Sequence, residues 1–197
     1  RLVPNVAGLV VNNETYQQLA TNGELTFDRL LDAIVSGKIS IGYPNPYASS
    51  TALNLLYAVF WRGAGHNEDG RPLTIADLES PQVNSVFKDF QDRVLITTTT
   101  TLDLKEIFIR DKDKLQAFPL EYQNYQELKQ VPGFENTVFV PFGIPHNNPL
   151  VGFDWNSPEE KEALQKFGDF ASSAPIKKLA EEQGFLETDY LQSDGLP

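Results

Sequence analysis

Residues 37–60 read "GKISIGYPNPYASSTALNLLYAVF", and this stretch decides the fold. A short apolar segment ending at Tyr43 predicts a strand, and the prolines that follow it predict a turn. From Thr51 to Arg62 the chain is almost wholly apolar, which predicts a buried helix that Gly63 ends. A strand that passes through one tight turn into a helix is the repeating unit of α/β proteins.

The same alternation continues on both sides of this stretch. Strands are predicted at residues 6–11, 94–101, 115–122 and 136–143, and helices at residues 24–38, 81–93, 102–114, 157–173 and 175–184. Ser157, Pro158 and Glu160 form the start signature of the first closing helix. We therefore expect an α/β protein with an open, largely parallel sheet.

Composition excludes several classes of protein. The 197 residues carry a formal net charge of −11, which argues against a nucleic-acid binder. Cysteine is absent, so disulfides and thiol catalysis are excluded. No apolar run is long enough to span a membrane. The chain starts at Arg1 and contains no methionine, so we expect a processed or trimmed product whose targeting segment has been removed.

Three consecutive hydroxyl residues, Ser49, Ser50 and Thr51, stand at the start of the central helix. Ser50 or Thr51 is the expected N-cap, and Ser49 is expected to precede it. The first backbone N–H groups of a helix lack internal partners and lie at the positive end of its dipole, so they can hold an oxyanion. The alternative is that the hydroxyls only cap the helix, which needs one hydroxyl rather than three.

A second hydroxyl cluster, Thr97–Thr101, lies where another predicted strand passes into a helix that begins near Leu102. Threonine favours strands, so the alternative is that the run only extends the strand. The carboxyl ends of parallel strands meet at one crevice, where ligands bind. The sequence therefore predicts an anion site made of backbone N–H and side-chain O–H groups from both clusters.

These segments, together with "TTTTTLDLKEIFIRD", "AFPLEYQNY", "VFVPFGIPHNNP" and "SPEEKEALQKFGDFASSAPIKKLAEEQGF", resemble the type 2 extracellular solute-binding proteins of ABC transporters. The nearest branch includes members fused to von Willebrand factor A domains. The resemblance covers nearly the whole chain. It implies two α/β lobes, joined by crossing strands, that close over a ligand.

On this resemblance, residues 12–136 form the central ligand-binding lobe. Residues 1–11 and 137–197 supply the crossing strands and the returning part of the other lobe, of which the chain has only a portion. The resemblance assigns ligand binding to both hydroxyl clusters and to a pair of residues near the cleft. These residues are Ser49, Ser50, Thr51, Thr99, Thr100, Thr101, Glu121 and Tyr122.

Two features depart from the family pattern. Glu121 and Tyr122 occur in the reverse of the family's Tyr-Glu order. Where the family has Asp-Gly-Thr after the returning strand, this chain has Phe142, Gly143 and Ile144. The second departure removes polar side chains from that side of the cleft.

Other chemistries find little support. No nucleophile elbow, zinc motif or phosphate-binding loop occurs, so a hydrolase has no nucleophile–base set behind it. His66 and His146 lie in polar or turn-rich stretches and are interpreted as surface residues. Tyr122 and Tyr125 could ligate ferric iron, but packing or cleft lining is the favoured interpretation. We expect no metal, no cofactor and no catalysis.

The expected function is a substrate-binding module of an ABC-type transporter or a related surface sensor. Its ligand would be a small oxyanion such as phosphate, sulfate or molybdate. Its partners would be an ABC permease or a von Willebrand factor A protein, in an extracellular or periplasmic location, with membrane attachment as a lipoprotein only through an anchor outside this chain. The alternative is an interaction module that keeps the fold and has lost small-molecule binding.

Overall fold

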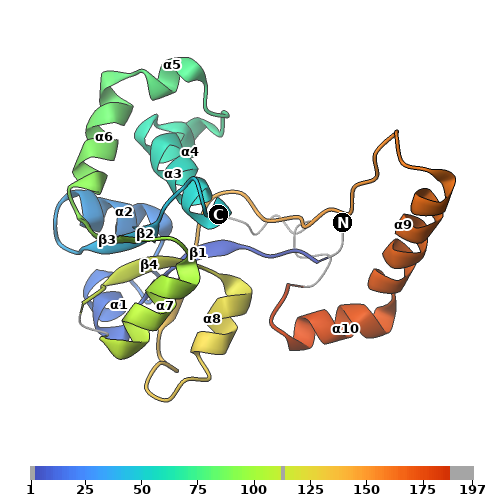
Figure 1. The fold of residues 1–197 in the computed structure, drawn as a ribbon. Coiled ribbons are helices and arrows are strands. Elements are labelled where there is room, and N and C mark those ends of the chain that lie inside the picture. The colour runs from blue at the N-terminus through green and yellow to red at the C-terminus, as the bar shows by residue number, and fades with distance from the viewer. Residues whose placement is uncertain (1–2, 112–113, 187–197) are drawn as a thin grey trace.

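A five-stranded sheet forms the centre of the computed structural model, which describes residues 3–111 and 114–186 (Figure 1). The strands, in the spatial order β3-β2-β4-β1-β5, are β1 (Ala7–Val11), β2 (Ile41–Pro44), β3 (Val94–Thr98), β4 (Ala117–Glu121) and β5 (Val138–Pro141). β2 pairs in parallel with β3 and β4, while β1 pairs antiparallel with β4 and β5. Of these five strands, only β1 opposes the rest. The expected α/β fold with an open, largely parallel sheet is confirmed.

Helices cover both faces of this sheet (Figure 1). Their bounds are α1 (Asn13–Leu19), α2 (Phe27–Val35), α3 (Ser50–Gly63), α4 (His66–Asp69), α5 (Ile75–Leu78), α6 (Pro81–Gln91), α7 (Thr101–Arg110), α8 (Tyr122–Leu128), α9 (Pro158–Ala171) and α10 (Ala174–Glu182). α2, α3 and α6 share one buried cluster with the sheet, and α7 and α8 share another. The sheet is therefore the middle of three layers.

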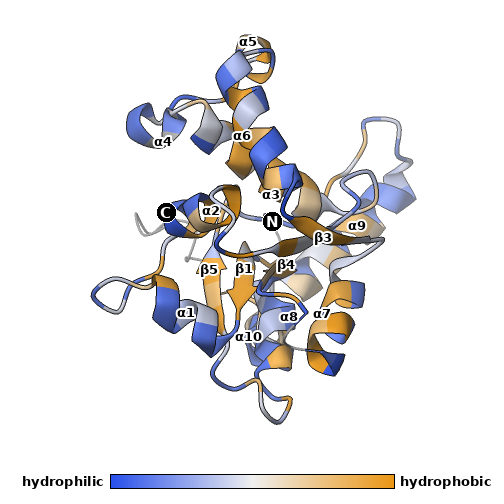
Figure 2. Cartoon of the chain, turned by 90° about the vertical axis from the view of Figure 1, so that its left-hand side faces the viewer, coloured by the Kyte–Doolittle hydropathy of each residue, from blue (hydrophilic) through white to orange (hydrophobic). Residues whose placement is uncertain are grey.

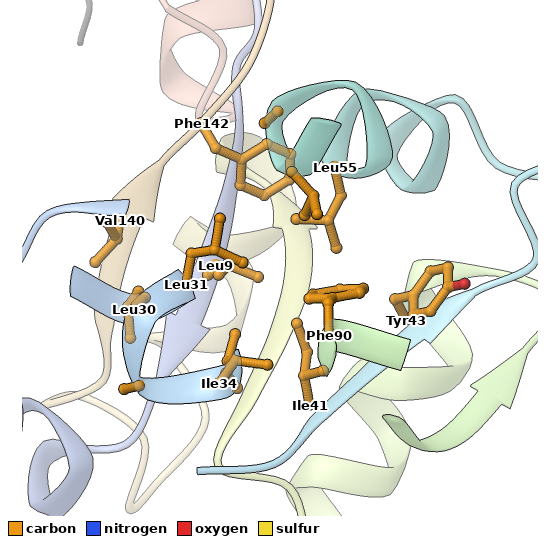
Figure 3. Close-up of a cluster of buried hydrophobic side chains, with 14 of the residues drawn as sticks. Leu9, Leu30, Leu31, Ile34, Ile41, Tyr43, Leu55, Phe90, Val140 and Phe142 are labelled. Carbon is orange, nitrogen blue, oxygen red and sulfur yellow. The ribbon is translucent and has the colours of Figure 1, made fainter. Parts of the chain in front are cut away.

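Side chains of β1 alternate between the two clusters. Leu9 and Val11 belong to the cluster under α2 and α3. Figure 3 shows Leu9 in this cluster together with Leu55 and Phe90. Val10 points to the opposite cluster. Because a strand buried on both faces needs apolar residues at every position, β1 is hydrophobic along its length (Figure 2).

α9 and α10 lie apart from the rest of the molecule, at the end of an extended connection (Figure 1). Within α9 only Ala171 is buried, and α10 buries no residue completely. Large apolar side chains of this region stay exposed to solvent, namely Val151, Phe153, Trp155, Phe167, Phe170 and Leu179. Among the described residues, no helix is both long and apolar enough to cross a membrane. The division of the chain at residues 12 and 136 stays a prediction.

The start of α9 was predicted correctly from the local sequence. Ser157 caps α9, and its hydroxyl oxygen and the Glu160 carboxylate satisfy each other's backbone N–H groups, as the sequence pattern indicates. Such a capping box depends only on residues three apart. It therefore forms wherever that local sequence begins a helix.

His66 is not a surface residue, which corrects the sequence-based interpretation. Its polar stretch folds into the short helix α4, and only 2% of the His66 side chain is exposed. Nδ1 lies 3.0 Å from the Asp69 carboxylate and Nε2 lies 3.1 Å from the Asp77 carboxylate. Each ring nitrogen faces a carboxylate oxygen, so whichever nitrogen carries a proton has an acceptor, and the imidazolium form can donate to both carboxylates.

The Asp77 carboxylate is expected to make stability depend on pH in the acid range. The Thr74 hydroxyl, and after it His66, lower the pKa of Asp77 to about 2. A carboxyl group with a lowered pKa in the folded state stabilises the protein above its unfolded pKa. That stabilisation is lost as the pH falls from about 4 to about 2.

Asp77→Asn should therefore lower the melting temperature at pH 6 and reduce its fall between about pH 4 and pH 2. Circular dichroism melts of both proteins across this range measure the effect. Equal pH dependence in the variant would show that Asp77 contributes nothing to acid stability.

Candidate functional site

The carboxyl ends of β2, β3 and β4 meet at one edge of the sheet, because these three strands run in parallel. Pro44 at the end of β2 is paired with Thr98 at the end of β3, and the N–H of Asn45 donates to the Thr98 carbonyl at 2.8 Å. The edge continues to Glu121, the last residue of β4. Each strand end leads directly into a helix: α3, α7 or α8. We call this edge the ligand edge.

Ser49 is the N-cap of α3, so the expectation that Ser50 or Thr51 caps the helix is wrong. The Ser49 hydroxyl oxygen accepts a hydrogen bond from the N–H of Ala52 at 3.3 Å. The N–H of Ser49 itself donates to the Asn45 carbonyl at 3.0 Å, which closes the preceding turn. Any of the three hydroxyls could cap a helix, and this turn determines which one does.

Ser50 and Thr51 follow the cap and have different surroundings. Ser50 is exposed, and its hydroxyl has no hydrogen-bond partner among the described residues. Thr51 is buried, and its hydroxyl donates to Oε1 of Glu121 at 3.3 Å. The backbone N–H groups of Ser50 and Thr51 find no acceptor within the described part of the chain. No acidic residue lies in the first turn of α3.

The threonine cluster is arranged differently. Thr100 caps α7, and its N–H and hydroxyl both donate to the Asp103 carboxylate, at 2.8 and 2.9 Å. These hydrogen bonds, the backbone one foremost, hold the pKa of Asp103 below its usual value. Thr101 is nearly buried, and Thr99 is exposed at the edge. The first turn of α7 therefore already binds a carboxylate of its own.

Glu121 accepts hydrogen bonds from groups that are far apart in the sequence. Besides Thr51, it is contacted by Nδ2 of Asn5 at 3.3 Å and by Nδ1 of His146 at 3.2 Å. The contact with His146 is the main cause that holds the pKa of the Glu121 carboxyl below its usual value, against the opposing effect of burial. His146 thus lies at the ligand edge and is not the free surface residue that the sequence suggested.

Tyr122 points away from the hydroxyl clusters. Its ring packs edge-on against Phe139 at 5.4 Å and lies 6.1 Å from the ring of Tyr125. This geometry agrees with the packing interpretation of the tyrosine pair. Among the described residues, no group of three or more histidine and acidic side chains could hold a metal ion.

Phe142, Gly143 and Ile144 stand where the sequence departs from the Asp-Gly-Thr pattern. In this chain they make structural contacts with α2 and α3. Phe142 is buried against Phe27, with ring centroids 5.6 Å apart. The side-chain amide of Asn54 on α3 holds the backbone of Ile144, accepting from its N–H at 2.9 Å and donating to its carbonyl at 2.8 Å. The returning segment is thereby attached to the helix that begins at the ligand edge.

Two cavities lie outside the hydroxyl clusters. One, of about 680 Å³, lies between α8 and the C-terminal end of α10 with the residues that follow it, and Tyr122 is in its wall. The other, of about 510 Å³, lies between α2, α3 and residues 141–144. Neither includes Ser49–Thr51 or Thr99–Thr101 in its lining. These two cavities are therefore separate from the hydroxyl clusters of the ligand edge.

Three residues of this site, Asn5, Asn54 and His146, were not predicted from the sequence. Asn5 lies 116 positions from Glu121 in the sequence, and Asn54 lies 90 positions from Ile144. An isolated asparagine or histidine in a loop carries no local signal of such a contact. The structure brings Ser49–Thr51, Thr99–Thr101 and Glu121 to one edge, but ligand binding by them stays a prediction.

Comparison with known proteins gives the fold. No protein-family model matches the chain, and no curated protein matches its sequence. Solved structures that resemble it include the sulfate-binding protein SubI from Mycobacterium tuberculosis, with a TM-score of 0.58, 15% identity, and coverage of 96% of this chain and 58% of that one. Maltose-bound MalE3 of T. maritima has a TM-score of 0.61 and 15% identity, with 96% and 54% covered. A periplasmic thiamin-binding protein has a TM-score of 0.58 and 12% identity, with 93% and 50% covered.

The chain thus spans between half and three fifths of the length of these structures. At such low identity the likeness concerns the fold and not the ligand, which differs among the three. The similar structures are mostly solute-binding proteins of ABC transporters. The chain therefore has the fold of about half of a solute-binding protein.

Proposed function

We propose that this chain is the ligand-binding lobe of a solute-binding protein of an ABC-type transporter or surface sensor, and that its ligand is a small oxyanion. Phosphate, sulfate and molybdate are the candidates. The observation that carries the proposal is the start of α3. There the N–H groups of Ser50 and Thr51 and the hydroxyl of Ser50 have no acceptor among the described residues.

The starts of α3 and α7 differ in their acidic contacts, and this difference supports different roles for the two hydroxyl clusters. At α7 the Asp103 carboxylate already occupies the N–H of Thr100 and opposes a second negative charge. The first turn of α3 contains no acidic residue, and the Glu121 carboxylate contacts it only at the Thr51 hydroxyl. The N–H groups of Ser50 and Thr51 stay without an acceptor among the described residues. We therefore assign the anion to α3, with Thr99 as the member of the threonine cluster that can add a hydroxyl.

An extracellular or periplasmic location belongs to the same proposal. An ABC permease would be the partner, and the von Willebrand factor A branch remains a proposed relationship. Any attachment to a membrane would lie outside the described residues. Because the similar structures are about twice as long, we propose that further polypeptide supplies the opposite wall of the site.

Thermal unfolding of the chain with sulfate, phosphate or molybdate tests the proposal. An anion at about 100 times its Kd should add about 2.7 kcal/mol to the free energy of unfolding. Sodium chloride at matched ionic strength controls for screening. If none of the three oxyanions raises the melting temperature above this control, the ligand class is wrong.

Ser50→Ala and Ser49→Ala separate binding from capping. The exposed Ser50 hydroxyl has no hydrogen-bond partner among the described residues, so Ser50→Ala should leave the melting temperature without anion unchanged and weaken anion binding at least tenfold. Ser49→Ala removes the cap and should cost about 0.5–2 kcal/mol with or without anion. Undiminished binding by Ser50→Ala, measured by calorimetry, would leave the hydroxyl without a ligand role.

A second candidate function is an interaction module without a small-molecule ligand. The exposed apolar side chains of α9 and of residues 151–155 before it favour this candidate, because exposed apolar patches mark sites of protein contact. Failure of all oxyanions together with concentration-dependent self-association or partner binding through Phe167 and Phe170 would support this candidate.

A further inference from the structure

The segment before β1 and the segment after β5 meet at the ligand edge. They form an isolated antiparallel bridge, Asn5 to His146. The N–H of each residue donates to the carbonyl of the other, at 2.9 and 2.8 Å. We call Asn5 and His146 with their immediate neighbours the crossing bridge. The segment after β5 continues to α9 and α10, so the bridge lies along the chain between the sheet and these helices.

Side chains attach this bridge to the ligand edge through Glu121. Nδ2 of Asn5 contacts Oε2, while Nδ1 of His146 and the Thr51 hydroxyl both contact Oε1. Asn5 and Thr51 are almost completely buried. The carboxylate therefore holds both strands of the bridge and the first turn of α3 at one point.

The second ring nitrogen of His146 also has a polar neighbour. Nε2 lies 3.5 Å from Nδ2 of Asn54, the same amide nitrogen that donates to the Ile144 carbonyl. A neutral ring protonated on Nδ1 can accept from Asn54 there and donate to Glu121. A second proton on Nε2 turns the Asn54 contact into one between two donors and adds charge to the Glu121 contact.

Glu121 is the acidic group that faces this ring. Of the acidic side chains in the described part of the chain, no other lies within ion-pair distance of His146. The remaining groups against the ring, from α3 and from the segment before β1, are the uncharged Asn54 and Asn5. The charge of the pair therefore changes with the protonation of the imidazole alone at pH values where Glu121 is ionised.

We propose that Glu121 and His146 are positioning residues whose ion pair tightens the crossing bridge when His146 is protonated, so that pH sets how firmly the bridge is held against the ligand edge. With a protonated His146 the charged pair and the bridge support each other. With a neutral His146 the pair keeps a neutral hydrogen bond and the bridge opens more often. The effect on solute affinity rests on the proposed function, whereas the effect on the bridge does not.

Hydrogen exchange of the Asn5 and His146 amides in the full 197-residue chain measures the opening of the bridge. After correction for the intrinsic pH dependence of exchange, we expect protection of both amides to fall about three- to tenfold between pH 5 and pH 8. Glu121→Gln keeps an acceptor without the charge and should abolish this change. His146→Gln should abolish it as well.

His66→Gln is the matched control, since the chain has two histidines and His66 lies elsewhere, between Asp69 and Asp77. It should preserve the pH dependence at the bridge. Should His66→Gln fail to fold, proton-detected titration of the two histidine rings in the unmodified chain identifies which one shares the pH midpoint of the bridge amides. A midpoint that follows His66, or protection that is independent of pH, overturns the proposal.

Sulfate and phosphate binding across the same pH range separates this proposal from the proposed function. Absence of binding together with a pH-dependent bridge rejects the oxyanion ligand and keeps the positioning pair. Binding together with a bridge that does not respond to pH rejects the pair and keeps the ligand.

Discussion

Replacement of Gly143 by alanine is expected to lower the free energy of unfolding by about 2–4 kcal/mol. Gly143 has φ = +69°, a left-handed conformation that costs other residues about 1–2 kcal/mol. A Cβ atom there would also collide with the side-chain amide of Asn54. Since that amide makes both hydrogen bonds to Ile144, the collision would release the returning segment from α3.

Gly133→Ala provides the matched control. Gly133 also has a positive φ, +91°, but a Cβ atom there meets nothing within 4 Å. Its cost should be the backbone term alone, about 1–2 kcal/mol. In urea unfolding, Gly143→Ala should be the more destabilising, and adding Asn54→Ala should cost less in the Gly143→Ala background than alone. Equal effects of the two glycine substitutions would contradict the role assigned to the Asn54 amide.

Phe108→Ala is expected to cost about 3–5 kcal/mol, a large part of the 5–15 kcal/mol typical of a domain. Phe108 lies on α7 with no exposed surface, and its ring is 4.9 Å from that of Phe118 and 5.5 Å from that of Phe134. Its removal leaves a cavity between α7 and β4. Because β4 ends in Glu121, the ligand edge should loosen together with the core.

Phe167→Ala, on α9, is the control for Phe108→Ala. The Phe167 side chain is 51% exposed, so its truncation should change the free energy of unfolding by about 0.5 kcal/mol or less. Chemical denaturation monitored by circular dichroism gives both values. If Phe167→Ala lowered the free energy of unfolding as much as Phe108→Ala, Phe167 would have to be buried by a contact that the described residues do not make.

Local pattern was enough to predict most elements of this fold. Apolar alternation and helical spacing located the strands and helices around residues 37–60, because both depend on neighbours within four positions. The capping box of Ser157 and Glu160 was predicted for the same reason. The cap of α3 was misplaced, since three adjacent hydroxyls satisfy the local rule equally well and the turn at Asn45 selects Ser49.

The candidate site could be predicted only in part. Parallel strand order brings the starts of α3 and α7 together, so the sequence could indicate both hydroxyl clusters as one edge. It could not show that Asp103 accepts from the first turn of α7, whereas Glu121 contacts the first turn of α3 only at the Thr51 hydroxyl. That difference depends on side-chain direction, which the spacing of residues does not define.

The sequence by itself determined the alternation of strands and helices, the class of the fold and the polar character of the strand ends. Only the tertiary structure decided that β1 runs against the other strands and that His66 is buried. It also decided that Glu121 joins Asn5, Thr51 and His146. Glu121 lies 116 positions from Asn5 and 70 from Thr51, and such contacts form only when the packed sheet brings distant segments together. Hydrogen bonds of this kind are set by the geometry of the whole fold, whereas caps and periodicity are set within a single turn or strand.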